Sequence, residues 1–273
     1  MGRIRFGARE LILLLGGILF VSPCVIAFLN SFKTLDQIRD SPWALPPLWD
    51  TSNYADLIAR VGLLRPMANS ALLTCAVLAG LIGVAPMAAH WIARHPGRAS
   101  RVLEVLFLAG LTIPFQIIVV PLLQEFDLLH IKLTYVSLWL HHVSWGLPLC
   151  IFIYGRFVRT IPRELEEAAA IDGCGQWSTF WRSVFPLLKP CTASVIIFWG
   201  LWIWNDFVQA YIVMGPERAD LAFVQLWKFI SDKYVKNWNT IFAGVVLLSA
   251  PVTILYISMQ RFFVKGLTAG SAK

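Results

Sequence analysis

Five long stretches without a charged residue constrain the fold of this 273-residue chain more than any other feature. Each is 20 to 28 residues long, and a helix needs about 20 apolar residues to cross a hydrocarbon core of about 30 Å. The chain is 58% hydrophobic and only 14% charged, with a mean hydropathy of +0.67, whereas soluble domains carry about 25% charged residues. A soluble enzyme, a disordered protein and a nucleic-acid-binding protein are all poor fits to this composition, and we expect no nucleic-acid partner.

A sixth, shorter stretch between Lys189 and Asp206 spans a bilayer if its helix starts near Val184 and Lys189 extends toward the headgroups. The first stretch is longer than the apolar region of a signal peptide and lacks a small-residue cleavage site, so we expect it to be retained. The sequence therefore predicts an all-α integral membrane protein, a single transmembrane domain over 1–273 in contact with membrane lipid. The six predicted spans lie near 11–30, 69–92, 103–123, 134–155, 185–206 and 240–261.

The distribution of charge predicts the orientation of these spans. If the N-terminus is cytoplasmic, the cytoplasmic segments hold 14 Lys and Arg against six acids, and the outer segments hold nine against ten. This split follows the positive-inside rule, and the reverse topology violates it. We expect both termini to be cytoplasmic, and the net charge of +7 needs no further explanation.

The predicted cytoplasmic loop 156–185 carries the most specific pattern. Pro162 suits the first turn of a helix, the acids that follow it suit the positive end of the helix dipole, and Gly173 suits the C-terminal stop. These signals predict a short helix over about 162–172, followed by an amphipathic turn that leads to Pro186. One face of that helix is predicted to hold Leu165, Ala168, Ala169 and Asp172. On composition alone, a simple connector between two spans remains an alternative.

The run Glu167-Ala-Ala-x-x-Asp172-Gly173, followed by Pro186, resembles the EAA loop of the permease subunits of ABC importers. Asn69-Ser70, Pro114, Pro121, Trp204-Asn-Asp-Phe207 and Gly266–Gly270 extend the resemblance over nearly the whole chain. Together they are similar to the carbohydrate-uptake branch, specifically its six-span, maltose-type partner permease. Cys174 and Gly175 depart from the usual residues after the glycine, which leaves the docking role in place.

The resemblance implies both site residues and partners. In this family the loop is a coupling helix that docks onto an ATPase. The docking residues it implies are Glu164, Leu165, Glu167, Ala168, Ala169, Asp172 and Gly173, and the C-terminal contact residues are Gly266, Leu267 and Thr268. The implied partners are a second, related permease, an ATPase dimer and an extracytoplasmic solute-binding protein, in the cytoplasmic membrane of a bacterium or archaeon.

Nothing in the chain matches the phosphate loop Gly-x-x-x-x-Gly-Lys-Ser/Thr. We therefore expect a non-catalytic subunit without a cofactor of its own, and expect ATP and Mg to be bound by the partner ATPase. Closure of that ATPase would move the coupling helix and switch the spans between inward- and outward-facing states.

Polar residues within predicted spans are candidates for a substrate pathway, because polar groups are costly in lipid and usually face a bundle interior or a cavity. For His141 and His142, the alternative is a hydrogen bond between helices. For Asn205 and Asp206, the alternative is a contact with neighbouring loops. Trp199, Trp202 and Trp204 fit an aromatic belt first and sugar stacking second. We expect no metal site, and the five cysteines have no metal-like spacing. The pathway candidates are Gln116, His141, His142, Asn205 and Asp206.

Three alternative functions remain. A glycerol-3-phosphate or glycerophosphodiester importer of the same class would favour Arg or Lys in the pathway, and no mid-span one is visible. A secondary transporter would show carboxylates at mid-membrane or an inverted repeat. A membrane enzyme using a His/Asp pair would be expected to show a catalytic motif.

Overall fold

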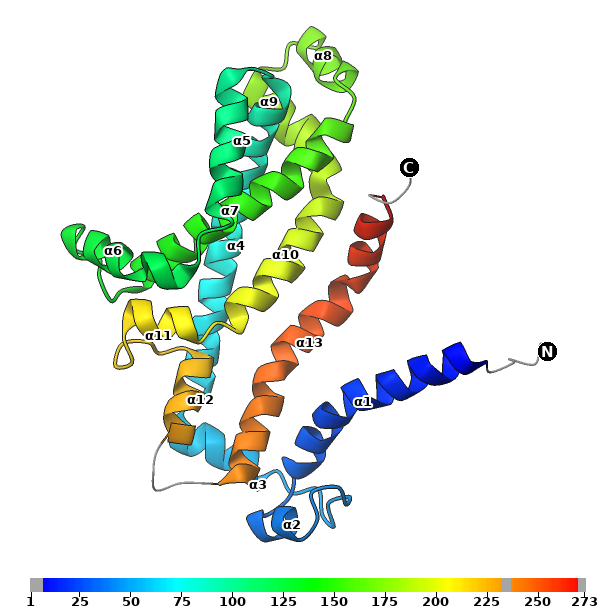
Figure 1. Cartoon of the computed structure of the whole chain (residues 1–273), viewed down its shortest axis with the longest axis vertical. Coiled ribbons are helices and arrows are strands. Elements are labelled where there is room, and N and C mark those ends of the chain that lie inside the picture. Colours follow the sequence, from blue (N-terminus) through cyan, green and yellow to red (C-terminus); the bar gives the residue numbers. More distant parts are fainter. Residues whose placement is uncertain (1–6, 232–236, 270–273) are drawn as a thin grey trace. The chain divides into compact units, whose positions relative to one another are not determined.

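The computed structural model describes residues 7–231 and 237–269, apart from the side chains of Ala8, Met259 and residues 261–269. The described residues form helices and connecting loops, with no strand among them (Figure 1). Gly266, Leu267 and Thr268 lie in the last helix, where the side chains are outside the described part. The helices are α1 (Ala8–Asn30), α2 (Leu35–Asp40), α3 (Ser52–Asp56), η1 (Leu57–Val61), α4 (Leu64–Arg94), α5 (Arg98–Gly110), α6 (Phe115–Leu128), α7 (Tyr135–Thr160), α8 (Glu164–Ile171), α9 (Gln176–Thr179), η2 (Phe180–Val184), η3 (Phe185–Leu188), α10 (Lys189–Trp204), α11 (Val208–Met214), α12 (Ala222–Ser231) and α13 (Trp238–Ala269).

The chain divides into two compact units. The first comprises Met1–Met67 and Gln225–Pro251, and the second comprises Ala68–Val224 and Val252–Lys273. The second unit contains both the predicted loop helix and all the predicted pathway residues. It is therefore the unit in which the candidate sites are built.

Within the described residues, five helical segments are long and apolar enough to cross a membrane, or up to six if the bent pair α5–α6 is one span. The segments Arg9–Asn30 and Leu64–Arg94 include the predicted spans near 11–30 and 69–92. The segments Tyr135–Thr160 and Trp238–Ser258 include most of the predicted spans near 134–155 and 240–261. The predicted fifth span near 185–206 overlaps the segment Gln176–Trp204, which begins earlier and ends at Trp204, so Asn205 and Asp206 lie just beyond the helix. The prediction of an all-α membrane protein is confirmed.

The predicted third span near 103–123 is not one straight helix. Helix α5 ends at Gly110, and α6 starts at Phe115 at an angle of 105° to it. Pro114, which caps α6, has extended backbone angles (φ −66°, ψ 139°) and has no N–H with which to continue the helix from α5. Figure 1 shows α6 turning away from α5 at this point.

Helix α7 forms the centre of the second unit, where it packs against α5, α10 and α11. Glycines allow it to come close to α4 and α10. A Cβ atom on Gly146 would lie 2.9 Å from Leu81 Cδ2 and 3.4 Å from Trp199 Cε2. Small residues at such crossings are typical of membrane helices, because packing and not the hydrophobic effect drives their association.

The prediction that Trp199 and Trp204 belong to an aromatic belt at the membrane interface is wrong. Both side chains are buried in the second unit, at 4% and 6% exposure. Trp202 is half-buried and lies edge-on to Trp199, with ring centroids 5.2 Å apart. The tryptophans of α10 therefore fill the interior of the unit.

The start of α10 is distorted where two prolines follow each other closely. Pro186 lies in the 3₁₀ turn η3 and Pro190 in the first turn of α10, directly after the π-helical turn η2. Since proline cannot donate the backbone hydrogen bond of a regular helix, the chain changes pitch here but stays helical. At Pro186 the helix type therefore changes locally without a break in the helix.

In the first unit, a buried asparagine joins two segments. Asn53 Nδ2 donates to the carbonyl oxygens of Ser31 and Lys33 at 2.9 and 3.0 Å, and its Oδ1 accepts from Asn239 Nδ2 at 2.6 Å. Lys33 is itself buried, and its Nζ donates to the carbonyl oxygen of Ser41 at 3.0 Å. Burial lowers the pKa of Lys33 below its ordinary value.

Candidate functional site

Helix α8 is the short helix predicted in the loop, and both its ends are fixed by local hydrogen bonds. Arg163 is the N-cap, so Pro162 lies one residue before the cap and not in the first turn of the helix as expected. At the other end Gly173 has φ +80°, its N–H donates to Ala170 O at 3.0 Å, and Cys174 N–H donates to Ala169 O at 2.9 Å. This pair of bonds is a Schellman motif, which explains the glycine.

The exposed surface of α8 and the following α9 combines large apolar side chains with acidic ones. Ile171 is 87% exposed and Leu165 47% exposed, and Trp177 in α9 is 69% exposed. Glu164, Glu167, Ala168, Asp172 and Gly173 are exposed as well. Ala169 differs from the other predicted docking residues because it is buried, at 8% exposure. In Figure 1 this helix lies at one end of the second unit, beyond the ends of α4, α5 and α7.

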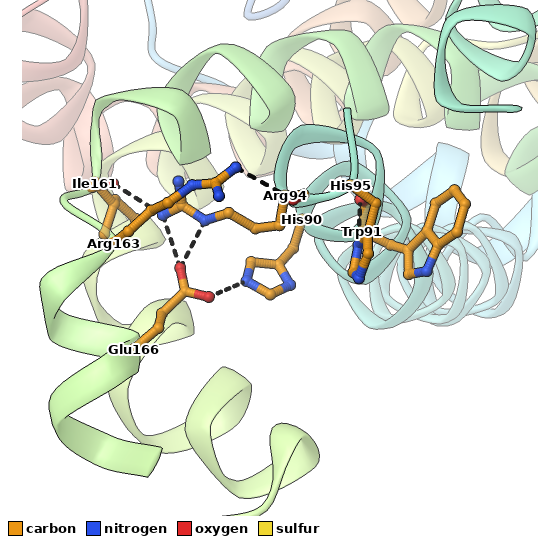
Figure 2. Close-up of polar contacts among 7 residues, drawn as sticks. All are labelled: His90, Trp91, Arg94, His95, Ile161, Arg163 and Glu166. Atoms are coloured by element: carbon orange, nitrogen blue, oxygen red, sulfur yellow. Dashed lines mark hydrogen bonds and ion pairs between the residues drawn. The ribbon is translucent and has the colours of Figure 1, made fainter. Parts of the chain in front are cut away.

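The inward face of α8 is tied to the end of α4 by a carboxylate that accepts from two side chains (Figure 2). Glu166 Oε1 lies 2.7 Å from both Nε and Nη2 of Arg94, and Oε2 lies 2.9 Å from His90 Nε2. The three side chains are 11 to 20% exposed. Arg94 Nη2 also donates to the carbonyl oxygen of Ile161 at 2.8 Å, just before α8.

A groove of about 400 Å³ lies beside this contact. Met87, Trp91 and His95 line it from α4 and its end, and Cys174 and Trp177 line it from the segment after α8. The same groove includes His90, Arg94 and Glu166 in its wall. The polar contact therefore closes one side of a groove that is otherwise mostly apolar.

A second cavity of about 630 Å³ brings together three of the five predicted pathway residues: Gln116, Asn205 and Asp206. Gln209, which was not among the predicted pathway residues, also lines this cavity and is buried. The rest of the wall is aromatic or aliphatic: Phe115, Phe198, Leu201, Trp202, Phe207 and Val208.

Asp206 forms the start of α11. Its Oδ1 and Oδ2 accept from the backbone N–H groups of Gln209 and Ala210 at 3.1 and 2.9 Å. Asn205 Nδ2 donates back to the carbonyl oxygen of Leu201 at 2.8 Å. The cavity wall is therefore positioned by the turn that joins α10 to α11.

The two histidines of α7 lie behind this wall and not in it. His141 Nε2 is 2.8 Å from Gln209 Oε1, which is the hydrogen bond between helices that was the alternative to a pathway role. His142 is fully buried, with Nε2 3.4 Å from Asp206 Oδ2. His141 therefore holds a cavity residue from inside the unit, and His142 lies beside Asp206.

A sequence profile of the binding-protein-dependent transport system inner membrane component family matches residues 71–269. The chain belongs to this family. The matched range includes α8 and every residue of the second cavity, so both candidate sites lie within the family region.

Individual relatives cover almost the whole length of this family member. The permease protein AmyC of Thermoanaerobacterium thermosulfurigenes, a probable starch degradation products transport protein, is 30% identical over 94% of this chain and 93% of its own. The multiple sugar-binding transport permease MsmG of Streptococcus mutans is 27% identical over 99% and 98%. The diacetylchitobiose uptake permease NgcG of Streptomyces coelicolor is 30% identical over 98% and 89%.

The fold of this permease also matches a chain in the crystal structure of a bacterial ABC transporter involved in the import of the acidic polysaccharide alginate. The TM-score is 0.80 at 20% identity, and the match covers 96% of this chain and 100% of the other. The comparison shows that the two chains share one fold.

Three residues of the α8 contact were missed by the sequence reasoning: His90, Arg94 and Glu166. The spacing of His90 and Arg94 places them on one face of a helix end, but no local signal connects them to an acid 72 residues away from Arg94. In the described part of the chain, no group of three His, Cys, Asp or Glu side chains is arranged to hold a metal ion. All five cysteines are free.

Proposed function

We propose that this chain is a permease subunit of an ATP-driven importer and that its cargo is a sugar or an oligosaccharide. The named uses of AmyC, MsmG and NgcG support a carbohydrate. The chemistry of the second cavity supports it as well. Aromatic rings such as Trp202 offer flat apolar surfaces, and Gln116 and Asn205 offer amides that bond hydroxyl groups.

A glycerol phosphate fits this cavity less well. Phosphate recognition favours arginine or lysine, and the residues that line the cavity include neither, whereas Asp206 adds a carboxylate that repels an anion. The named relatives do not favour that alternative either.

Helix α8 is proposed to couple this pathway to a separate ATPase. A single observation carries the coupling role: an eight-residue helix with an exposed, partly apolar outward face and an inward face bonded to α4. Leu165, Ala168 and Asp172 would contact the ATPase directly, together with Glu164 and Glu167. Ala169 and Gly173 would act differently, since Ala169 packs inside the unit and Gly173 ends the helix.

The proposed assembly follows from this arrangement. The α8 end of the second unit and both chain termini would be cytoplasmic, in agreement with the excess of Lys and Arg in those segments. Two ATPase subunits would bind ATP and Mg, since this chain has no phosphate loop. A second permease would complete the pathway, and a solute-binding protein would deliver the cargo on the outer side.

The experiment is gentle purification of the chain from its native membrane, followed by ATPase assays with candidate cargo and the co-purified binding protein. We expect a second permease and an ATPase with a phosphate loop to co-purify. An oligosaccharide, and not glycerol 3-phosphate, should stimulate hydrolysis. A lone chain without ATPase would contradict the proposal.

A matched pair of glutamines tests the cavity. Both lie on α6 and both are exposed, but Gln116 lines the cavity and Gln124 does not. Gln116→Ala should raise the sugar concentration needed for half-maximal ATPase stimulation, and Gln124→Ala should leave it unchanged. Equal effects of the two variants would remove the cavity from the pathway.

A further inference from the structure

We propose that Glu166 is a positioning residue that fastens the coupling helix to α4, so that α4 transmits the movement of α8 into the membrane. This inference rests on the proposed function and adds the residue through which the coupling acts. Glu167, the first residue of the recognised motif, is exposed, and the adjacent Glu166 is the one that faces the unit.

The contact has the geometry of a strong polar connection. Arg94 approaches Oε1 with both Nε and Nη2 at 2.7 Å, while His90 Nε2 holds Oε2 at 2.9 Å. His90 and Arg94 are four residues apart on α4, so they present side chains to Glu166 from consecutive turns. With an exposed fraction of only 19% for the Glu166 side chain, water screens this pair less than a surface pair.

The backbone on both sides adds to the connection. Arg94 Nη2 donates to Ile161 O at 2.8 Å, and Arg163 Nη2 donates to Arg94 O at 3.2 Å. Figure 2 shows these bonds converging on the last turn of α4 from Ile161, at the entry of the loop, and from Arg163, the N-cap of α8. The last turn of α4 therefore holds the start of the loop and the first turns of α8 together.

The opposite end of α4 is bonded as well. Asn69 Nδ2 donates to Asp220 O and Oδ2 at 3.0 Å, and Ser70 Oγ accepts from Ala222 N at 3.0 Å. Between these ends α4 packs closely on α7, where a Cβ on Gly80 would lie 2.9 Å from Val143 Cγ2. A displacement of α8 would thus reach α7 and the segment 220–222 through one continuous helix.

A second ion pair of the same type provides a matched control. Arg159 Nη2 lies 3.0 Å from Glu104 Oε1 and joins α7 to α5. Its side chains are more exposed, at 49% and 39%, and neither belongs to α8. Glu104→Gln therefore removes an ion pair from the same unit without touching the coupling helix.

The test is the number of sugar molecules transported per ATP hydrolysed, measured in proteoliposomes with the complete transporter. In Glu166→Gln we expect this ratio to fall by roughly tenfold, because charge-assisted hydrogen bonds are among the stronger polar contacts. The sugar concentration for half-maximal stimulation should stay unchanged, since Glu166 does not line the second cavity. Glu104→Gln should keep the wild-type ratio. An unchanged ratio in Glu166→Gln, or an equal loss in the control, would overturn the proposal.

A double variant tests whether Arg94 and Glu166 affect coupling together or independently. If Arg94 and Glu166 act as one unit, Arg94→Gln combined with Glu166→Gln should lose no more coupling than the stronger single variant. Multiplied losses would overturn the inference. If the transporter with Glu166→Gln does not assemble, Arg94→Lys is tested in its place. Lysine keeps the charge but lacks the guanidinium group that reaches both Glu166 and Ile161. An unchanged transport ratio in Arg94→Lys would also overturn the inference. Absence of ATP-dependent uptake by the wild-type complex would instead refute the proposed function.

Discussion

Replacement of Gly146 by alanine should destabilise the second unit, although alanine is the better helix former. The added Cβ would lie 2.9 and 3.0 Å from the two methyl carbons of Leu81 and 3.4 Å from the Trp199 ring. Leu81 is fully buried and Trp199 is 4% exposed, so neither side chain can move aside without displacing others. Overpacking of this kind typically costs about 1–3 kcal/mol.

Gly155 on the same helix provides the control. A Cβ at Gly155 would meet no atom within 4 Å, so Gly155→Ala should gain up to about 1 kcal/mol from helix propensity alone. The same gain offsets part of the cost at Gly146, so we expect Gly146→Ala to lose up to about 2 kcal/mol net.

The assay is equilibrium unfolding of the purified protein in mixed SDS and mild-detergent micelles, followed by tryptophan fluorescence. The free energy of unfolding should fall for Gly146→Ala and hold or rise for Gly155→Ala. Equal free energies for the two variants would refute the close packing of α4, α7 and α10 around Gly146.

Three further predictions concern single polar contacts. Ser70→Ala leaves the buried N–H of Ala222 without its acceptor at 3.0 Å, so the same unfolding assay should show a loss of about 1–3 kcal/mol; a change below about 0.5 kcal/mol, the usual range for surface substitutions, would contradict that bond. Asp206→Asn weakens the acceptor for the N–H groups that begin α11 and should raise the sugar concentration for half-maximal ATPase stimulation. An unchanged concentration would show that this turn does not position the sugar-binding wall of the cavity. Burial lowers the pKa of Lys33, so the folded state loses this proton at a lower pH than the unfolded state does. The free energy of unfolding should therefore rise as pH increases from the folded pKa toward the ordinary value of 10.5. Lys33→Met should abolish this rise, and a rise of the same size in the variant would mean that another group causes it.

The positions of most spans could be predicted from the sequence because apolar length depends on neighbouring residues only. The span predicted near 134–155, for example, begins at the N-cap of the helix Tyr135–Thr160 and otherwise falls inside it. The end of α8 at Gly173 was predictable for the same reason, since a left-handed backbone needs a local glycine.

Features that depend on contacts between distant segments could not be predicted in this way. Pro114 was visible as a helix breaker, but the 105° angle of α6 is not set by that residue alone. Trp199 carries the signature of a membrane-interface residue, and its burial depends on the space that Gly146 leaves on another helix. Glu166 is one of three acids in the first turns of α8, and only the fold shows which of them faces Arg94.

Site-specific photo-crosslinking in intact membranes tests the central claim most directly. A benzoyl-phenylalanine residue placed at Ile171, 87% exposed on α8, is compared with one at Leu128, 80% exposed at the end of α6. We expect irradiation to join Ile171 to a polypeptide with an ATP-binding phosphate loop, and Leu128 to give no such product. An ATPase product at Leu128 but not at Ile171, or at neither position, would contradict the coupling role of α8.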